Sequence, residues 1–254
     1  MTIHLANLSG IVLVYLLVFS RTGAMVMLLP AIGDVGVPSR VRLALALAIS
    51  LAFAPTVAHN YSAEAPQSAI ALGLLIAQEV IAGILVGAMA RIIVSSLSTA
   101  GFFIASQTGL AFAQTIDPAM SQQGAVVANF ISLLGTVLIF STNAHYLALG
   151  AIAGSYTLLP PGAALPTADM AELTLKLVTG SFLLGLQLAA PFLVFGFAVN
   201  AAMGLLARLM PQLQIFFIAA PLNILLGFLM IIFLLGSMMT LFLSYFGTEM
   251  SRFG

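Results

Sequence analysis

The chain has 254 residues, of which 62% are hydrophobic and only 6% are charged, and its mean hydropathy is +1.19. This composition excludes an ordinary soluble domain and predicts a membrane protein. Seven basic and seven acidic residues give a net charge of zero, and no lysine or arginine block marks a nucleic-acid surface. Cysteine is absent, which excludes disulfides, thiolate metal sites and thiol nucleophiles.

Apolar windows of about 20 residues, the length that a membrane-crossing helix needs, recur along the whole chain. In chain order they cover residues 8–29, 41–57, 69–94, 125–147, 179–207 and 213–245. The sequence therefore predicts an all-α protein of about six long apolar helices arranged as membrane-associated hairpins. The last two windows would each reach roughly 45 Å, against a hydrocarbon core of about 30 Å, so tilt, kinks or protrusion must absorb the excess.

Four residues of the third window are spaced by four along the predicted helix: Glu79, Gly83, Gly87 and Arg91. Neighbouring members share a helix face, and Gly83 with Gly87 forms a GxxxG pattern that permits close helix approach. Glu79 could bind a proton or an ion, but an interfacial or partner-paired carboxylate is the favoured interpretation. We expect all four residues to serve helix packing or partner contacts.

Residues 95–123 are too polar to span a membrane comfortably and too apolar for an ordinary exposed loop. Glycines provide flexible points, Asp117-Pro118 favours a turn or a helix start, and phenylalanines supply bulky contacts. Irregular backbone at membrane depth is tolerated only beside protein or water, which favours a re-entrant or pore-side loop. An amphipathic connector on the membrane surface is an equally open alternative.

Two breaks mark the C-terminal half of the chain. The proline-rich and glycine-rich stretch 158–166 is expected to end a helix and to precede a C-terminal hairpin. Arg208, close to Pro211 and Gln212, separates the last two apolar windows and predicts the tip of that hairpin. A charge and a proline are costly in lipid, so this tip must lie at an interface or against protein.

The sequence contains little that indicates a catalytic site. There is no HExxH pair, and His4, His59 and His145 lie far apart without matched acidic neighbours. No glycine-rich phosphate cradle is found either. Polar residues in the helices, such as Asn223, could bind a substrate, but hydrogen bonds across helix interfaces are favoured. We therefore predict neither an enzyme nor a cofactor or metal site.

Several collinear motifs resemble the FliR family of flagellar export-gate proteins. In the N-terminal half they are residues 37–43, 98–101, 107–112 running into 116–118, and 143–145; in the C-terminal half they are residues 200–208 and 211–216, followed by Pro221. The matches cover nearly the whole chain in the same order. Thr108 stands before Gly109 where some relatives have a methionine.

The resemblance implies a core subunit of the flagellar type III export gate in the basal body of the bacterial inner membrane. Such a subunit assembles with FliP-like and FliQ-like proteins into a channel for unfolded flagellar proteins, next to FlhB-like and FlhA-like proteins. It also implies a FliP-like part, residues 1–166, with a plug-like loop at 95–124, and a FliQ-like hairpin, residues 167–254. The implied gate residues are Gln107, Gly109, Phe112, Asp117 and Pro118, and Arg208, Pro211 and Gln212 are implied partner contacts.

Two other functions remain open at this stage. A virulence injectisome counterpart of the SctT type would share the fold and differ in its cargo. A secondary transporter would move substrate as a purified protein, but the sequence lacks the paired acids and the inverted repeat that many such transporters show.

Overall fold

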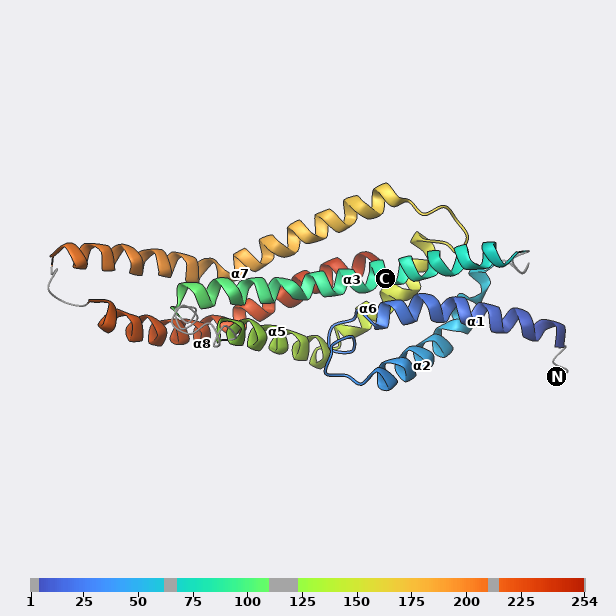
Figure 1. Cartoon of the computed structure of the whole chain (residues 1–254), viewed down its shortest axis with the longest axis horizontal. Coiled ribbons are helices and arrows are strands. Elements are labelled where there is room, and N and C mark those ends of the chain that lie inside the picture. The colour runs from blue at the N-terminus through green and yellow to red at the C-terminus, as the bar shows by residue number, and fades with distance from the viewer. Residues whose placement is uncertain (1–4, 62–67, 110–122, 210–214, 254) are drawn as a thin grey trace. The chain divides into compact units, whose positions relative to one another are not determined.

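The structure is a computed structural model that describes residues 5–61, 68–109, 123–209 and 215–253. Within these residues the chain forms seven α-helices and two short 3₁₀ helices, η1 and η4, and no strand (Figure 1). In chain order the elements are α1 (Leu5–Val26), α2 (Ser39–Val57), η1 (Ala58–Asn60), α3 (Ala69–Gln107), α5 (Gln123–Ser141), α6 (His145–Leu158), α7 (Thr167–Leu209), α8 (Ile215–Met250) and η4 (Ser251–Phe253). The predicted all-α class is confirmed.

Four stretches of the described chain are long and apolar enough to cross a membrane, or five if α5 and α6 are taken as one span. They are Ser39–Asn60, Ala69–Gln107, Thr167–Leu209 and Ala219–Met250. The longest helix, α7, has 43 residues and extends about 65 Å, roughly twice the hydrocarbon thickness. Part of α7 must therefore lie outside a flat bilayer or be surrounded by protein.

The predicted single helix at residues 125–147 is wrong, because the structure divides this window into α5 and α6. The residues between these helices include Asn143, whose φ of 60° lies in the left-handed region. Asparagine tolerates this conformation better than most residues, and a helix cannot continue through it. The proline-rich stretch 158–166 does lie between two helices, α6 and α7, as expected.

The predicted helix end at Val94 is also wrong, because α3 continues to Gln107. Several hydroxyl groups that made this stretch look polar form hydrogen bonds within the chain. Thr99 and Ser106 donate to the carbonyl oxygens of Ser95 and Phe103, at 3.2 and 2.8 Å, and the Ser98 and Ser132 hydroxyls lie 2.9 Å apart. Polar residues that bond to their own helix or to a neighbouring helix do not require a loop.

The chain forms two compact units. Unit 1 contains residues 1–93, 143–177 and 246–254, and unit 2 contains residues 94–142 and 178–245. Helices α3, α7 and α8 therefore contribute to both units. This division follows contacts within the chain and does not test the FliP-like and FliQ-like parts, which stay a prediction.

Unit 1 has a core in which α1 packs on α2 and on the first part of α3. Tyr15 donates to the carbonyl oxygen of Leu47 at 3.1 Å, and the buried hydroxyls of Thr22 and Ser50 are hydrogen-bonded to each other. The fully buried side chains of this core include Leu17, Met25, Met89, Ile93, Ile152 and Tyr156.

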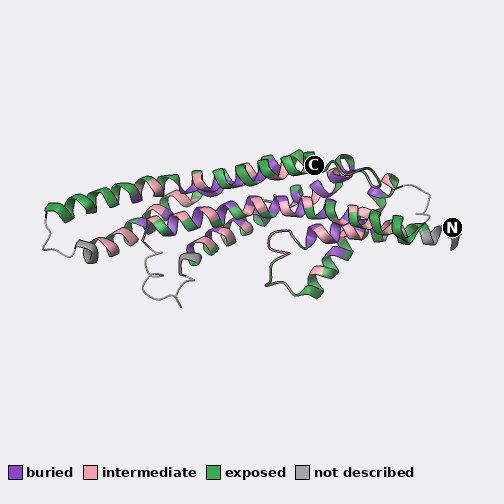
Figure 2. Cartoon of the chain, turned by 45° about the horizontal axis from the view of Figure 1, so that its top comes forward, coloured by how far each residue is buried: buried purple, intermediate pink, exposed green. Residues whose placement is uncertain are grey.

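Unit 2 is formed by the end of α3, by α5 and by the facing parts of α7 and α8. Its buried side chains include Leu97, Ile104, Ile131, Phe192 and Phe242. The last turns of α7 are largely exposed, and Figure 2 shows them in green. Leu205 and Leu209 are 64% and 76% exposed there, so this stretch presents an apolar surface that the chain itself does not cover.

Candidate functional site

A buried ion pair joins α1 and α3 in unit 1. Arg21 on α1 donates from Nε to Glu79 Oε2 at 2.7 Å and from Nη2 to Glu79 Oε1 at 3.2 Å. The two side chains are only 3% and 0% exposed. A guanidinium matches a carboxylate in this two-bond geometry, which offsets part of the cost of removing both charges from water.

The rest of the guanidinium is occupied by α6 and the residue that follows it. Nη1 donates to Ser155 Oγ at 3.1 Å, and Nη2 donates to the carbonyl oxygen of Leu159 at 2.8 Å. The guanidinium carbon lies 3.9 Å from the centre of the Tyr156 ring, a cation-π contact. We call this set, Arg21 with Glu79, Ser155, Tyr156 and Leu159, the arginine cluster.

Tyr61 extends the arginine cluster at the end of the α2 segment. Its hydroxyl donates to the Tyr156 hydroxyl at 3.4 Å, and the two rings meet edge to face. Burial raises the pKa of Tyr61 far above its ordinary value, so the hydroxyl stays protonated as a donor. The arginine cluster thus links four segments of unit 1 that are distant in sequence.

Gly83 and Gly87 allow α1 to approach α3 beside this cluster. A Cβ at Gly83 would collide with the backbone carbonyl oxygen of Arg21, and one at Gly87 would lie 2.8 Å from Leu28 Cβ and from the Met25 carbonyl oxygen. Glycine is therefore required at both positions for this spacing. The role of these residues as contacts to another subunit stays a prediction.

The arginine cluster is unsuited to catalysis or metal binding. Its only carboxylate is buried against a guanidinium, and an acid or base must reach a substrate. In the described part of the chain no group of three or more histidine, cysteine, aspartate or glutamate side chains could hold a metal ion. The cluster is a structural junction of charged and aromatic groups. The sequence singled out Glu79 but did not indicate Arg21 as its partner. The available signal was the position of Arg21, a charged residue at the end of an apolar run.

In unit 2 the C-terminal end of α3 fits into a seat formed by α7 and α8. Asn223 Nδ2 on α8 donates to the carbonyl oxygen of Gln107 at 3.2 Å, which satisfies one of the carbonyls left open at a helix end. The predicted use of Asn223 across a helix interface is thereby confirmed. Gly196 on α7 lies against the Gln107 side chain, and Gly227 on α8 lies against Thr108. We call Gly196, Asn223 and Gly227 the α3 seat.

Gly109 follows directly, with a φ of +79°. A glycine in the left-handed conformation just after a helix is a common C-terminal cap. The Thr108 amide still makes the helical bond to the Ile104 carbonyl oxygen, at 3.0 Å, and the chain leaves the helix at Gly109. Of the five predicted gate residues, Gln107 and Gly109 lie here; Phe112, Asp117 and Pro118 lie outside the described residues.

The other predicted contact residues are dispersed. Arg91 on α3 pairs with Asp34 at 3.3 Å, and both side chains are about half exposed, at 49% and 53%. Arg208 is exposed near the end of α7. Pro211 and Gln212 lie outside the described residues. The structure therefore brings Glu79, Gly83 and Gly87 together around α1 in unit 1, whereas Arg208 belongs to unit 2.

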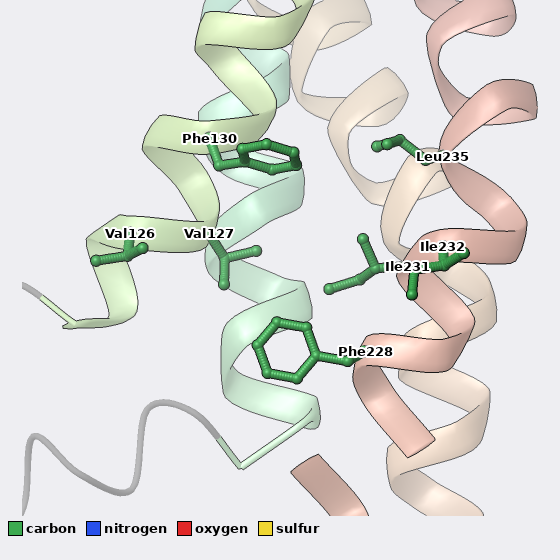
Figure 3. A pocket seen from close by; sticks show the side chains of 7 residues that line it. All are labelled: Val126, Val127, Phe130, Phe228, Ile231, Ile232 and Leu235. Atoms are coloured by element: carbon green, nitrogen blue, oxygen red, sulfur yellow. The ribbon is translucent and has the colours of Figure 1, made fainter. Parts of the chain in front are cut away.

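An apolar groove of about 550 Å³ lies between α5 and α8 in unit 2. In Figure 3, Val127 and Phe130 from α5 and Phe228 and Ile231 from α8 extend into the space between the two helices. All seven lining side chains are apolar, so the groove can accept only apolar groups. It offers no polar contact that would orient a soluble substrate.

The geometry thus describes a helical membrane protein with structural junctions and with no catalytic group among those described. A family described as bacterial export proteins, family 1, has a sequence profile that matches residues 12–248. The chain belongs to this family.

Several known proteins are similar to the chain over most of their length. The chain is 45% identical to the flagellar biosynthetic protein FliR of Caulobacter vibrioides over 211 residues. This match covers 83% of this chain and 84% of the relative. The chain is 33% identical to FliR of Escherichia coli, over 82% of this chain and 78% of the relative. It is also 29% identical to the Yop proteins translocation protein T of Yersinia pestis, over 61% of this chain and 60% of that protein.

Proposed function

We propose that the chain is the FliR-type subunit of a flagellar protein export apparatus in the bacterial inner membrane. The observation that carries this proposal is the 45% identity to a FliR protein over 83% of the chain. The lower identity and shorter match to the Yersinia translocation protein favour the flagellar system over an injectisome. Because the chain belongs to a family of export proteins, we also expect it to associate with other components of the apparatus.

In the proposed assembly the subunit forms a channel with FliP-like and FliQ-like proteins, next to FlhB-like and FlhA-like proteins. Unfolded flagellar proteins pass through this channel, driven by energy supplied elsewhere, and this subunit carries out no covalent chemistry. The exposed apolar end of α7, which reaches Arg208, supports a partner contact there because so apolar a surface needs cover.

The proposed role of residues 107–123 is to close the channel, and the described end of α3 supports a fixed starting point for this segment. Gln107 and Gly109 are held by a hydrogen bond, by glycine contacts and by a left-handed cap. The proposed division into residues 1–166 and 167–254 places these residues in the FliP-like part.

Deletion of the gene and complementation with the intact chain test the proposal. We expect loss of motility and of filament-protein secretion in the deletion, both restored by the chain, while secretion of any injectisome cargo is unchanged. Mild-detergent purification of a tagged chain should also recover two further small hydrophobic subunits, identified by mass spectrometry. Normal filament secretion in the deletion, or a pure homo-oligomer that transports a solute alone, would contradict the proposal.

A further inference from the structure

Unit 1 contains a cavity of about 350 Å³ where several helix ends meet α3. Its walls come from the end of α6, from the start of α7, from Arg252 in η4 and from Leu85 and Val86 on α3. The volume falls in the range of about 300–1,000 Å³ that is usual for small-molecule sites. Nothing in the proposed export function uses this cavity.

The lining combines a charged edge with an apolar wall. Asp169, in the first turn of α7, and Arg252 both line the cavity. Most of the other lining side chains are apolar, among them Leu85, Leu158 and Leu173. An amphiphile fits such a site better than either a polar solute or a simple hydrocarbon, because each part of the molecule finds matching surface.

The charges at this edge are complementary to a group that carries both signs. Arg252 donates from Nη1 to Glu249 Oε2 at 2.8 Å, which uses one of the five donors of its guanidinium. Asp169 is exposed, and none of the four ion pairs among the described residues includes it. The edge therefore offers a carboxylate to a cation and several guanidinium donors to an anion.

The cavity lies among the ends of three helices. α6 ends at Leu158, α7 begins at Thr167 and α8 ends at Met250, so charged and apolar residues meet here. In membrane proteins this change from apolar to charged side chains falls near the headgroup region.

The inner wall of the cavity is part of the arginine cluster. Ser155 lines the cavity and is 1% exposed, and its hydroxyl accepts from Arg21 Nη1. Leu159 also lines the cavity, and its carbonyl oxygen accepts from Arg21 Nη2. A molecule that fills the cavity would hold both acceptors in place and so stabilise the buried ion pair.

We propose that this cavity binds a zwitterionic phospholipid with a primary ammonium group, of the phosphatidylethanolamine type. The ammonium pairs with Asp169, the phosphate accepts from Arg252, and acyl methylenes lie on the wall that contains Leu85 and Leu173. An anionic phospholipid without the ammonium would meet the Asp169 carboxylate unpaired, and it should therefore bind more weakly. This inference rests on the cavity and does not depend on the proposed export function.

Native mass spectrometry of the delipidated full-length chain tests the assignment, with phosphatidylethanolamine and phosphatidylglycerol of matched acyl chains as probes. We expect phosphatidylethanolamine to bind about tenfold more tightly, a preference that Asp169→Asn removes; Arg252→Gln should weaken both lipids. Glu172→Gln is the matched control, since this exposed carboxylate lies three residues along the same helix, pairs with Lys176 and does not line the cavity.

A cavity-filling variant, Leu173→Phe, tests the acyl contact separately. This test remains valid even if the Asp169→Asn or Arg252→Gln protein fails to fold. It should reduce binding of both lipids while the circular dichroism spectrum stays unchanged. Phosphatidylethanolamine should also raise the melting temperature of the wild type and not that of Leu173→Phe. Equal affinity for the two lipids, or a preference that persists in Asp169→Asn, would overturn the assignment. So would a lipid-independent loss of a partner subunit in Asp169→Asn, because a basic side chain of that partner would then be the occupant.

Discussion

The arginine cluster of unit 1 and the α3 seat of unit 2 secure helices by different means. The cluster uses a buried guanidinium with a carboxylate, a hydroxyl, a carbonyl oxygen and an aromatic ring as partners. The seat uses one neutral hydrogen bond and two glycines. Charged junctions are costly to break because a remaining partner stays buried and unpaired, whereas glycine junctions are sensitive to added volume. Truncating a side chain should therefore destabilise the arginine cluster more than the α3 seat, and enlarging a side chain should destabilise the α3 seat more.

The largest effect should come from breaking the buried ion pair on one side. Arg21→Met and Glu79→Met should each lower the free energy of unfolding by about 3–5 kcal/mol, because each leaves an uncompensated buried charge. The double variant should recover most of this loss, since two apolar side chains then replace the pair. Denaturant unfolding of the wild type, the two single variants and the double variant in detergent micelles measures this double-mutant cycle. Additive losses in the double variant would show that the two charges are not coupled.

Added volume at the α1 and α3 contact should have the next largest effect. Gly83→Ala places a methyl group against the Arg21 carbonyl oxygen, so we expect a loss of about 1–3 kcal/mol in unfolding free energy. Gly73→Ala on the same helix has open space around its Cβ and should be neutral or stabilising by up to about 1 kcal/mol. Equal behaviour of the two variants would contradict the close approach.

A smaller effect is expected at the cap of α3. Gly109→Ala puts a Cβ on a residue with a φ of +79°, at a cost of about 1–2 kcal/mol. If this cap fixes the start of the gate, the variant should assemble normally and let ions leak across the membrane of living cells. Gly236→Ala on α8, where a Cβ meets nothing within 4 Å, is the control. A tight membrane in Gly109→Ala cells would count against a gating role for this position.

Hydropathy alone was enough to predict the all-α class and the approximate place of most long helices, because an apolar window of about 20 residues has few other stable conformations in a membrane. The division at Asn143 escaped prediction because the polar residues Ser141, Thr142, Asn143 and His145 form a short stretch with apolar residues on both sides, and a window of about 20 residues averages over it. The pairing of Arg21 with Glu79 also escaped, because a contact across 58 residues depends on how α1 and α3 meet. The Gly83 and Gly87 pattern indicated a close approach but could not identify the helix that makes it.

The smallest effect should come from the exposed pair of Arg91 and Asp34. Both side chains are about half exposed, so water and salt screen their attraction, and Arg91→Ala should change the unfolding free energy by less than about 1 kcal/mol. That change should vanish in 1 M salt, where the Debye length is about 3 Å, whereas the loss in Arg21→Met should persist because its partners are buried. Unfolding of both variants at low and high salt measures the difference. If Arg91→Ala instead reduces recovery of the partner subunits without changing unfolding, its guanidinium serves an interface between subunits, which is one of the two roles expected from the sequence.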